Sequence, residues 1–258
     1  MKHHVARLGI AVLVIGALAR PAGAQLLGNP VYFSPKQPTG LTLALDFGST
    51  LNLKYDGAKY VVDGASVKPN NLGARATLGL PLITVGVGVG IYNPDLTVAG
   101  VSADKDVQFM GNAALKIFSP PLVPIGISLQ AGAGYLRQGS GTGAVKTISV
   151  PIGLGVAIKP PTPGVSVEVW GAPRVQLNAV SVSGGGSRAQ AGIGASGGVN
   201  LGMPMGLGLH LAVDYTRMSA KASAGTGGLA LPETQSMVFG AGLHYTFTIP
   251  GLPIVPII

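Results

Sequence analysis

Hydrophobic and polar residues alternate with a period of two along most of the chain. From Leu41 to Tyr55 an aliphatic or aromatic residue stands at nearly every odd position, with a small or polar residue between. Successive side chains of a β-strand point to opposite faces, so this segment is predicted to be a strand with one apolar face and one polar or glycine face. The same pattern returns about nine more times, which predicts an all-β fold.

This alternation predicts ten strands. They lie near residues 41–55, 71–80, 83–92, 107–118, 125–136, 145–158, 165–177, 190–201, 207–215 and 235–249. Most of them reach the ~9 to 11 residues that a tilted strand needs to cross a membrane.

The predicted connections are of two kinds, which alternate along the chain. Four are short and contain proline: 80–82, 119–124, 159–164 and 202–205. The other five are mostly longer and polar: 56–70, 93–106, 137–144, 178–189 and 217–234. Short periplasmic turns, longer outer loops and an even strand count are typical of barrels in the bacterial outer membrane. The sequence therefore predicts an antiparallel up-and-down transmembrane β-barrel of about ten strands over residues 39–249.

The N-terminal residues predict export. Lys2 and Arg7 precede an apolar run that ends at Ala19, and Ala22-Gly23-Ala24 has the form of a cleavage site. This is the pattern of a secretory signal peptide, predicted here as residues 1–24. The alternative is a membrane anchor, but the apolar run is shorter than the ~20 residues of a spanning helix. Residues 25–38 are then an N-terminal periplasmic segment, and residues 250–258 a proline-rich C-terminal tail.

Composition supports a membrane location. Charged residues make up 10% of the chain, against about 25% in a typical soluble domain. There is no cysteine, so disulfides contribute nothing to the stability of this exported protein. Without the predicted signal peptide, 14 of the 17 basic residues remain against 9 acidic ones, and they are scattered. No basic stripe with interleaved aromatic residues is present, so we expect no nucleic-acid partner, and a mildly basic rim near lipid headgroups is the simpler interpretation.

The third strand shows how the two faces are assigned. Val85, Val87 and Val89 share one face, and Thr84 and Gly86 lie on the other. In a membrane barrel the apolar face contacts lipid and the polar face lines the lumen. We expect aromatic girdles at both ends of the strands, with these members: Tyr55, Phe109, Tyr135, Tyr215 and Phe239 toward the long loops, and Tyr245 and Phe247 toward the short turns.

Four polar residues of the inward face are predicted to lie at similar heights. They are Asp46, Arg75, His210 and His244, on consecutive strands if the tenth strand closes against the first. Buried charges need partners, so we interpret them as an ion-pair and hydrogen-bond cluster. A ligand or ion constriction and a catalytic site are the alternatives. Other inward polar or aromatic residues are Gln108, Lys116, Gln130, Lys159, Glu168, Trp170, Arg174, Asn200 and Asp214.

No catalytic residue, metal site or cofactor is predicted. Residues 192–197 spell G-x-G-x-x-G, but a dinucleotide site needs that string between a strand and a helix, and here it lies within a predicted strand. His244 and Asp46 could supply an acid–base pair, with Thr42 or Thr77 as the nearby hydroxyls. These residues do not form a convincing catalytic motif, so we predict that the protein is not an enzyme.

The chain resembles the broad class of small bacterial outer-membrane β-barrel proteins. The most specific part of the resemblance is the last strand, where Gly242, Tyr245 and Phe247 match a glycine-x-x-hydrophobic-x-aromatic assembly signal. The pattern departs from that signal at Gly240, where a polar residue is usual, and the chain continues for eleven residues past Phe247. The resemblance implies a location in the cell outer membrane, contact with its lipid, and recognition by the barrel-assembly machinery during biogenesis.

Three functions remain open from the sequence. The first is an outer-membrane barrel with a structural, adhesive or narrow-pore role. The second is a barrel enzyme that acts on lipid or peptide. The third is a soluble secreted β-barrel that binds an apolar ligand, which would place Val85, Val87 and Val89 inside.

Overall fold

The protein is an all-β closed barrel. The computed structural model describes residues 39–62, 64–98, 101–120, 123–141, 143–222, 229–247 and 249. Ten long strands of these residues form the wall: β1 (Gly40–Tyr55), β5 (Asn70–Gly79), β6 (Ile83–Asn93), β9 (Asp106–Phe118), β10 (Ile125–Gln138), β11 (Val145–Ile158), β12 (Ser166–Val182), β13 (Ser187–Gly202), β14 (Leu207–Met218) and β15 (Thr234–Phe247).

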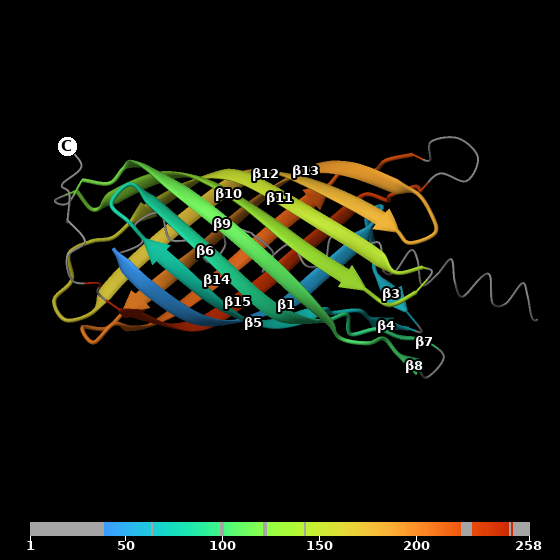
Figure 1. Cartoon of the computed structure of the whole chain (residues 1–258), viewed down its shortest axis with the longest axis horizontal. Helices are drawn as coiled ribbons and strands as arrows, with labels where there is room; N and C mark the ends of the chain where they lie inside the picture. The colour runs from blue at the N-terminus through green and yellow to red at the C-terminus, as the bar shows by residue number, and fades with distance from the viewer. Residues whose placement is uncertain are drawn as a thin grey trace, which may run out of the picture.

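Each strand of the wall pairs antiparallel with its neighbour in the sequence, and β15 pairs with β1 to close the barrel. The closing register runs from Leu41 opposite Phe247 to Tyr55 opposite Thr234. The strands run obliquely to the barrel axis, as Figure 1 shows. The predicted up-and-down transmembrane barrel of about ten strands is confirmed.

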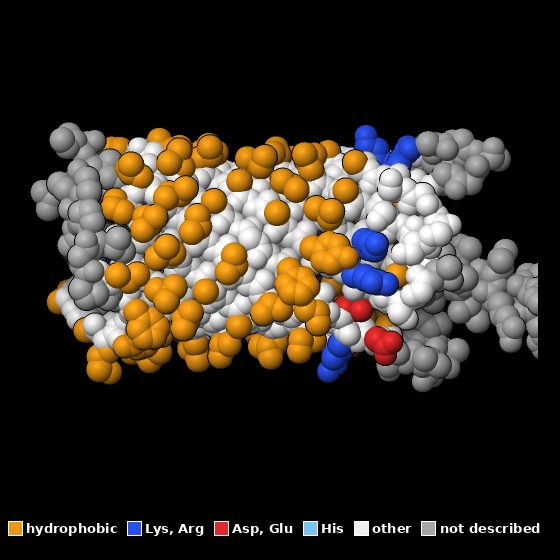
Figure 2. All heavy atoms as spheres, in the orientation of Figure 1, with side chains coloured by type: hydrophobic (Ala, Val, Ile, Leu, Met, Phe, Trp, Pro, Cys, Tyr) orange, Lys and Arg blue, Asp and Glu red, His pale blue; other side chains and the backbone are white. Residues whose placement is uncertain are grey.

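Side-chain burial confirms which face of the wall is apolar. On β6, Val87 is 65% exposed and Val89 49%, whereas Thr84 between the outward positions is 1% exposed. Hydrophobic side chains cover the outside of the wall, and the charged side chains in this view gather at one end (Figure 2). Apolar outward faces contact lipid, so the alternative of a soluble barrel with these valines inside is wrong.

The two kinds of connection lie at opposite ends of the barrel (Figure 1). The long-loop end carries short strands beyond the wall: β2 (Ala58–Lys59) pairs antiparallel with the end of β1, β3 (Val61–Val62) pairs with β4 (Ala65–Ser66), and β7 (Thr97–Val98) pairs with β8 (Val101–Ser102). One connection is shorter than the sequence predicts. The expected loop 178–189 is mostly strand, because β12 and β13 continue pairing up to Ser181 opposite Ser187.

A β-bulge in β1 overturns part of the predicted face assignment. The register with β15 shifts between Thr50 and Asn52, which adds one residue to β1 at this point. A bulge leaves the extra residue unpaired and reverses the alternation beyond it. Leu53 is therefore buried, at 4% exposure. Tyr55 packs against Tyr60, with ring centroids 4.8 Å apart, and its hydroxyl is buried, so its predicted place in the lipid-facing girdle is wrong.

Two prolines within the wall coincide with interruptions of the strand ladder. Pairing of β10 with β11 stops at Ala131–Ile152 and resumes at Gly134–Ser149, a gap that includes Pro151. Pairing of β11 with β12 has a similar gap that includes Pro173. Proline has no amide hydrogen for the ladder, so each proline faces a neighbouring strand where the bond is missing.

No helix among the described residues is long and apolar enough to cross a membrane. The predicted signal peptide, the N-terminal segment 25–38 and the tail 250–258 lie outside the described residues.

Candidate functional site

Four inward side chains meet where the barrel closes. Asp46 is on β1, Arg75 on β5, His210 on β14 and His244 on β15, and these strands are consecutive around the wall. We name these four residues the histidine cluster. The structure brings together all four residues that the sequence singled out. Asp46, Arg75 and His210 are buried, with exposed fractions of 1%, 6% and 4%.

Asp46 is the centre of the histidine cluster. Arg75 Nε donates to its Oδ2 over 3.0 Å, and His210 Nε2 lies 2.8 Å from its Oδ1. The Nδ1 atoms of His210 and His244 are 3.4 Å apart, and the two rings stack with centroids at 5.7 Å. A neutral His210 with its proton on Nε2 would present that proton to the carboxylate and turn its Nδ1 lone pair toward His244.

Glycines let these side chains cross a strand. His210 reaches Asp46 over β15, and the β15 residue opposite both of them is Gly242. A Cβ atom added at Gly242 would lie 2.5 Å from His210 Cε1 and from the Leu45 carbonyl oxygen. His244 in turn lies over Gly208 of β14, where an added Cβ would lie 2.5 Å from its Cε1. Without side chains at these two positions, the imidazole rings lie flat against the wall.

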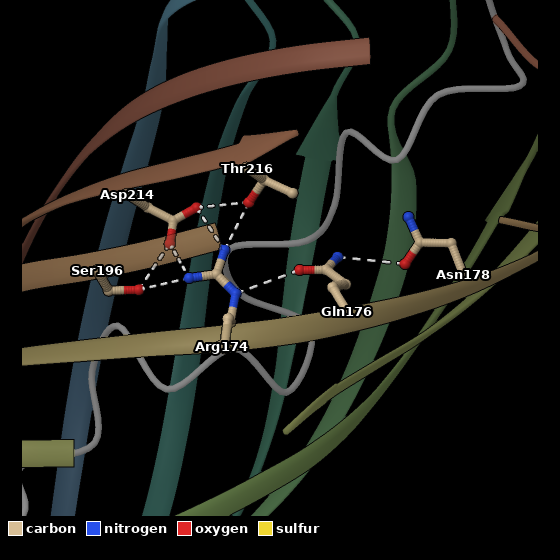
Figure 3. Close-up of polar contacts among 6 residues, drawn as sticks. All are labelled: Arg174, Gln176, Asn178, Ser196, Asp214 and Thr216. Carbon is tan, nitrogen blue, oxygen red and sulfur yellow. Dashed lines mark hydrogen bonds and ion pairs between the residues drawn. The ribbon is translucent and has the colours of Figure 1, made fainter. Parts of the chain in front are cut away.

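A second polar cluster lies on β12, β13 and β14, farther toward the long loops (Figure 3). Arg174 Nη1 lies 2.6 Å from Asp214 Oδ2 and donates to Ser196 Oγ over 2.8 Å. Arg174 Nη2 donates to Asp214 Oδ1 over 2.9 Å and to Thr216 Oγ1. Ser196 Oγ donates to Asp214 Oδ2 over 2.6 Å. We name these four residues the arginine cluster; the Arg174 and Asp214 side chains are 0% and 1% exposed.

In the arginine cluster, as in the histidine cluster, a long side chain passes over a glycine of the neighbouring strand. Arg174 is opposite Gly194 on β13, and Gly194 is opposite Thr216 on β14. An added Cβ at Gly194 would lie 2.8 Å from Arg174 Cζ, because the guanidinium lies directly over this glycine. A hydrogen-bonded chain continues from Arg174 Nε to Gln176 and on to Asn178, over 3.3 and 3.2 Å (Figure 3).

Side chains from neighbouring strands cover other inward glycines as well. An added Cβ at Gly88 would lie 2.5 Å from Met110 Cε, and one at Gly90 would lie 2.9 Å from Gln108 Nε2. Trp170 covers Gly198 in the same way. The inward glycines therefore make room for longer side chains on the next strand, and this room is filled rather than left as open volume.

Other inward residues predicted from the sequence make local contacts. Asn200 donates to Glu168 over 2.9 Å, Gln130 donates to Ser128 over 3.0 Å, and Lys116 Nζ donates to the Leu80 carbonyl over 2.9 Å.

The sequence analysis named Arg174 and Asp214 as inward residues but did not pair them, and it missed Ser196 and Thr216. Strand register was the signal that could have found them. Counting back from the short connection between β13 and β14 places Ser196 opposite Asp214. The contact of Arg174 with Thr216 across Gly194 requires the register of β12 with β13 as well as that of β13 with β14.

The histidine cluster contains an acid–base pair, but the structure shows neither candidate hydroxyl hydrogen-bonded to a histidine. Thr42 Oγ1 lies 2.9 Å from Thr246 Oγ1, and Thr77 Oγ1 accepts from Arg75 Nη1 over 3.4 Å. Among the described residues, no three His, Cys, Asp or Glu side chains are arranged to hold a metal ion.

The residues of the predicted assembly signal occupy both faces of β15. Gly242 is buried under His210, whereas Tyr245 and Phe247 are 42% and 46% exposed on the outer face. The two aromatic rings contact each other edge to face, with centroids 4.6 Å apart. They lie at the short-turn end, where the sequence predicts a girdle.

Comparison with known proteins finds similar folds only. No protein-family model and no curated protein sequence matches the chain. The β domain of the Bordetella autotransporter BrkA is 14% identical, with a TM-score of 0.51 over 81% of this chain and 100% of that chain. Neisserial surface protein A is 14% identical (TM-score 0.40; 81% and 98%). The outer membrane protease OmpT from Escherichia coli is 10% identical (TM-score 0.41; 83% and 100%).

At 10% to 14% identity, a structural likeness shows a shared fold but gives no information on activity. The likeness to the BrkA β domain shows a barrel fold, and the present chain closes into a barrel whose apolar outer belt is of the kind that contacts lipid. It is an outer-membrane β-barrel protein.

Proposed function

We propose that this protein is a structural barrel of the outer membrane whose lumen passes at most small solutes and whose long-loop end serves as an adhesive surface. One observation carries the first half of the proposal. Five inward side chains, Asp46, Arg75, Arg174, His210 and Asp214, contact one another along the wall as ion pairs, and they are only 1% to 6% exposed. In a wide aqueous channel such side chains would be solvated.

Packing between the loops at the long-loop end supports the adhesive role. Val67 and Leu96, from two different loops, are each 5% exposed and pack together, with Tyr60 against them. The Lys68 amide donates to Asp95 Oδ2 over 3.2 Å, which links the same two loops. A second small core joins Leu231 to Val145 and Val180. Loops with cores of their own present a defined surface to a partner.

Planar bilayer recording tests the proposal. The reconstituted protein is expected to give small conductance or none, and Arg174→Ala is expected to raise the conductance by removing the side chain that ties β12 to β14. Large, stable currents that are equal in the wild type and the variant would contradict the proposal.

A barrel enzyme is the second candidate, favoured by the close contact between His210 and Asp46. Hydrolysis of lipid or peptide substrates by detergent-solubilised protein, lost in His210→Ala but kept in His244→Ala with both barrels folded, would support it. Equal activity in all three proteins would assign the hydrolysis to a contaminant.

Two partners belong to this proposal. Outer-membrane lipid covers the apolar belt, and the barrel-assembly machinery recognises β15 through Gly242, Tyr245 and Phe247. Replacing both aromatic residues with serine is expected to slow insertion by that machinery in reconstituted vesicles. Unchanged insertion would place the signal elsewhere in the chain.

A further inference from the structure

Two basic side chains lie directly opposite each other on the outer face of the wall. Arg137 near the end of β10 pairs with Lys146 near the start of β11, and both are exposed. Residues opposite each other on one face have Cβ atoms about 4.5–5.5 Å apart, and like charges at that separation destabilise a sheet. In isolation this pair therefore costs stability.

Neither side chain has an acidic partner among the described residues. The ion pairs of these residues join other groups: Arg75–Asp46, Arg174–Asp214, His210–Asp46 and Arg217–Glu233. The strands that flank β10 and β11 carry one acid each: Asp106 on β9, whose Oδ1 accepts a hydrogen bond from the Gly139 amide, and Glu168 on β12, which accepts one from Asn200. Asp106 has the parity of the buried Gln108, so it lies on the inward face, whereas Arg137 and Lys146 face outward.

Arg217 provides an internal contrast. It lies on the outward face of β14 at the same end of the barrel, but it has a carboxylate partner: its Nε and Nη2 donate to Glu233 over 3.1 and 3.0 Å. These hydrogen bonds hold the pKa of the Glu233 carboxyl below its ordinary value, so the pair persists into mildly acidic solution. One outward basic site thus carries its counter-ion, and the Arg137–Lys146 site does not.

The position of Arg137 and Lys146 along the barrel axis places them near the edge of the lipid-facing belt. Two residues toward the short-turn end, Tyr135 is opposite Phe109 on β9 and Ile148 on β11, and the latter two are 53% and 47% exposed. Aromatic side chains mark the membrane–water interface. Two residues of a strand rise ~7 Å, so the basic pair lies just beyond this row. Figure 2 shows Lys and Arg side chains at the long-loop edge of the apolar belt, with acidic side chains close by.

We propose that Arg137 and Lys146 bind the phosphate of an anionic lipid headgroup in the leaflet on the long-loop side. Arginine offers a planar fork that matches phosphate oxygens, and lysine adds a compact positive charge. The lipid phosphate supplies a direct counter-ion, which no ion pair of the described residues provides to Arg137 or Lys146. Its acyl chains would then lie along the apolar belt below.

The test compares two double variants with the same loss of charge. Arg137→Ser/Lys146→Ser removes the proposed site, and Lys59→Ser/Lys221→Ser removes two exposed basic residues of the loops. Binding of phosphatidylglycerol to each protein in neutral detergent micelles is measured by native mass spectrometry. Each basic residue near a membrane surface contributes about 1 kcal/mol, so the first variant should bind roughly 10- to 30-fold more weakly. The loop variant should change less than twofold.

Thermal unfolding in micelles gives a second readout that also checks folding. Without anionic lipid, Arg137→Ser/Lys146→Ser should unfold at the same temperature as the wild type or higher, because the repulsion is gone. With phosphatidylglycerol, only proteins that keep the pair should gain stability. Equal losses in both double variants, equal binding of phosphatidylcholine, or the same stabilisation by inorganic phosphate alone would overturn the proposal.

Discussion

The histidine cluster and the arginine cluster both pair buried polar side chains across neighbouring strands, but they use different side chains to do so. In both, a long side chain passes over a glycine of the neighbouring strand and reaches a carboxylate or hydroxyl two strands away. Both therefore tie three strands together across the inner wall. They differ in how the carboxylate is held: Asp214 contacts Arg174 and the Ser196 and Thr216 hydroxyls, whereas Asp46 contacts both Arg75 and His210.

The described contacts thus give Asp46 two basic partners, Arg75 and His210, whereas Asp214 combines one arginine with neutral hydroxyls. Removing Arg174 or Asp214 leaves the other charge buried, and an unpaired buried charge is costly. Removing His210 leaves the Asp46–Arg75 pair in place. The arginine cluster is thus expected to be the more fragile of the two under single substitutions, and all four of its residues are buried, whereas His244 is only half-buried.

The largest expected effect is that of Asp214→Ala. It removes the carboxylate from Arg174 and should cost about 3–5 kcal/mol of unfolding free energy. Urea unfolding in lipid vesicles measures this through Trp170, the one tryptophan of the chain. The double variant Arg174→Met/Asp214→Leu should recover most of the loss. A cost below about 1 kcal/mol for the single variant would show that the cluster does not depend on this pair.

Alanine at the crossed glycines should have the next largest effect. Gly194→Ala places a Cβ 2.7 Å from the Tyr215 carbonyl oxygen as well as against Arg174, and Gly242→Ala meets the Leu45 carbonyl oxygen at 2.5 Å. Overpacking of this kind costs about 1–3 kcal/mol.

The matched control for these glycine variants is Gly197→Ala on β13. Its nearest atom, the Trp170 carbonyl oxygen, would be 3.5 Å from the added Cβ, an ordinary contact, so the substitution should be nearly neutral. If all three variants lost the same stability in urea, general backbone flexibility would account for the loss, and not the crossing side chains.

Single histidine substitutions should rank below the glycine variants. His210→Ala removes a close partner of Asp46 and should cost about 1–3 kcal/mol. His244→Ala removes only the 3.4 Å contact with the His210 ring and should cost about 1 kcal/mol or less. The same urea experiment measures both. A larger loss for His244→Ala would mean that His244, and not Asp46, organises the cluster.

The smallest effect is expected for Arg217→Ala, because this ion pair is exposed to solvent. Its cost should be close to the error of the unfolding measurement at neutral pH. The lowered pKa of Glu233 means that any contribution is present above the ordinary pKa of a glutamate and is lost as the pH falls through the lowered value. Unfolding curves of both proteins at neutral and acidic pH should therefore converge on the acidic side.

The local pattern of the sequence determined the wall of the barrel. Period-two alternation on β6 correctly assigned Val87 outward and Thr84 inward, because side-chain direction in a strand is a local property. The proline-containing connections and longer loops correctly gave the antiparallel order. The histidine cluster could also be anticipated on the assumption of closure, because an even strand count lets the tenth strand pair antiparallel with the first.

Only the tertiary structure decided how side chains meet across strands. The bulge near Thr50 moved Leu53 and Tyr55 to the other face, and alternation alone does not reveal such an insertion. The arginine cluster depends on two registers at once, so that Arg174, Gly194 and Thr216 fall in one row. The Arg137–Lys146 pair likewise depends on register, because the register of the β10–β11 hairpin places these two residues opposite each other. Strand pairing joins residues that are remote in sequence, and that information resides in the closed sheet.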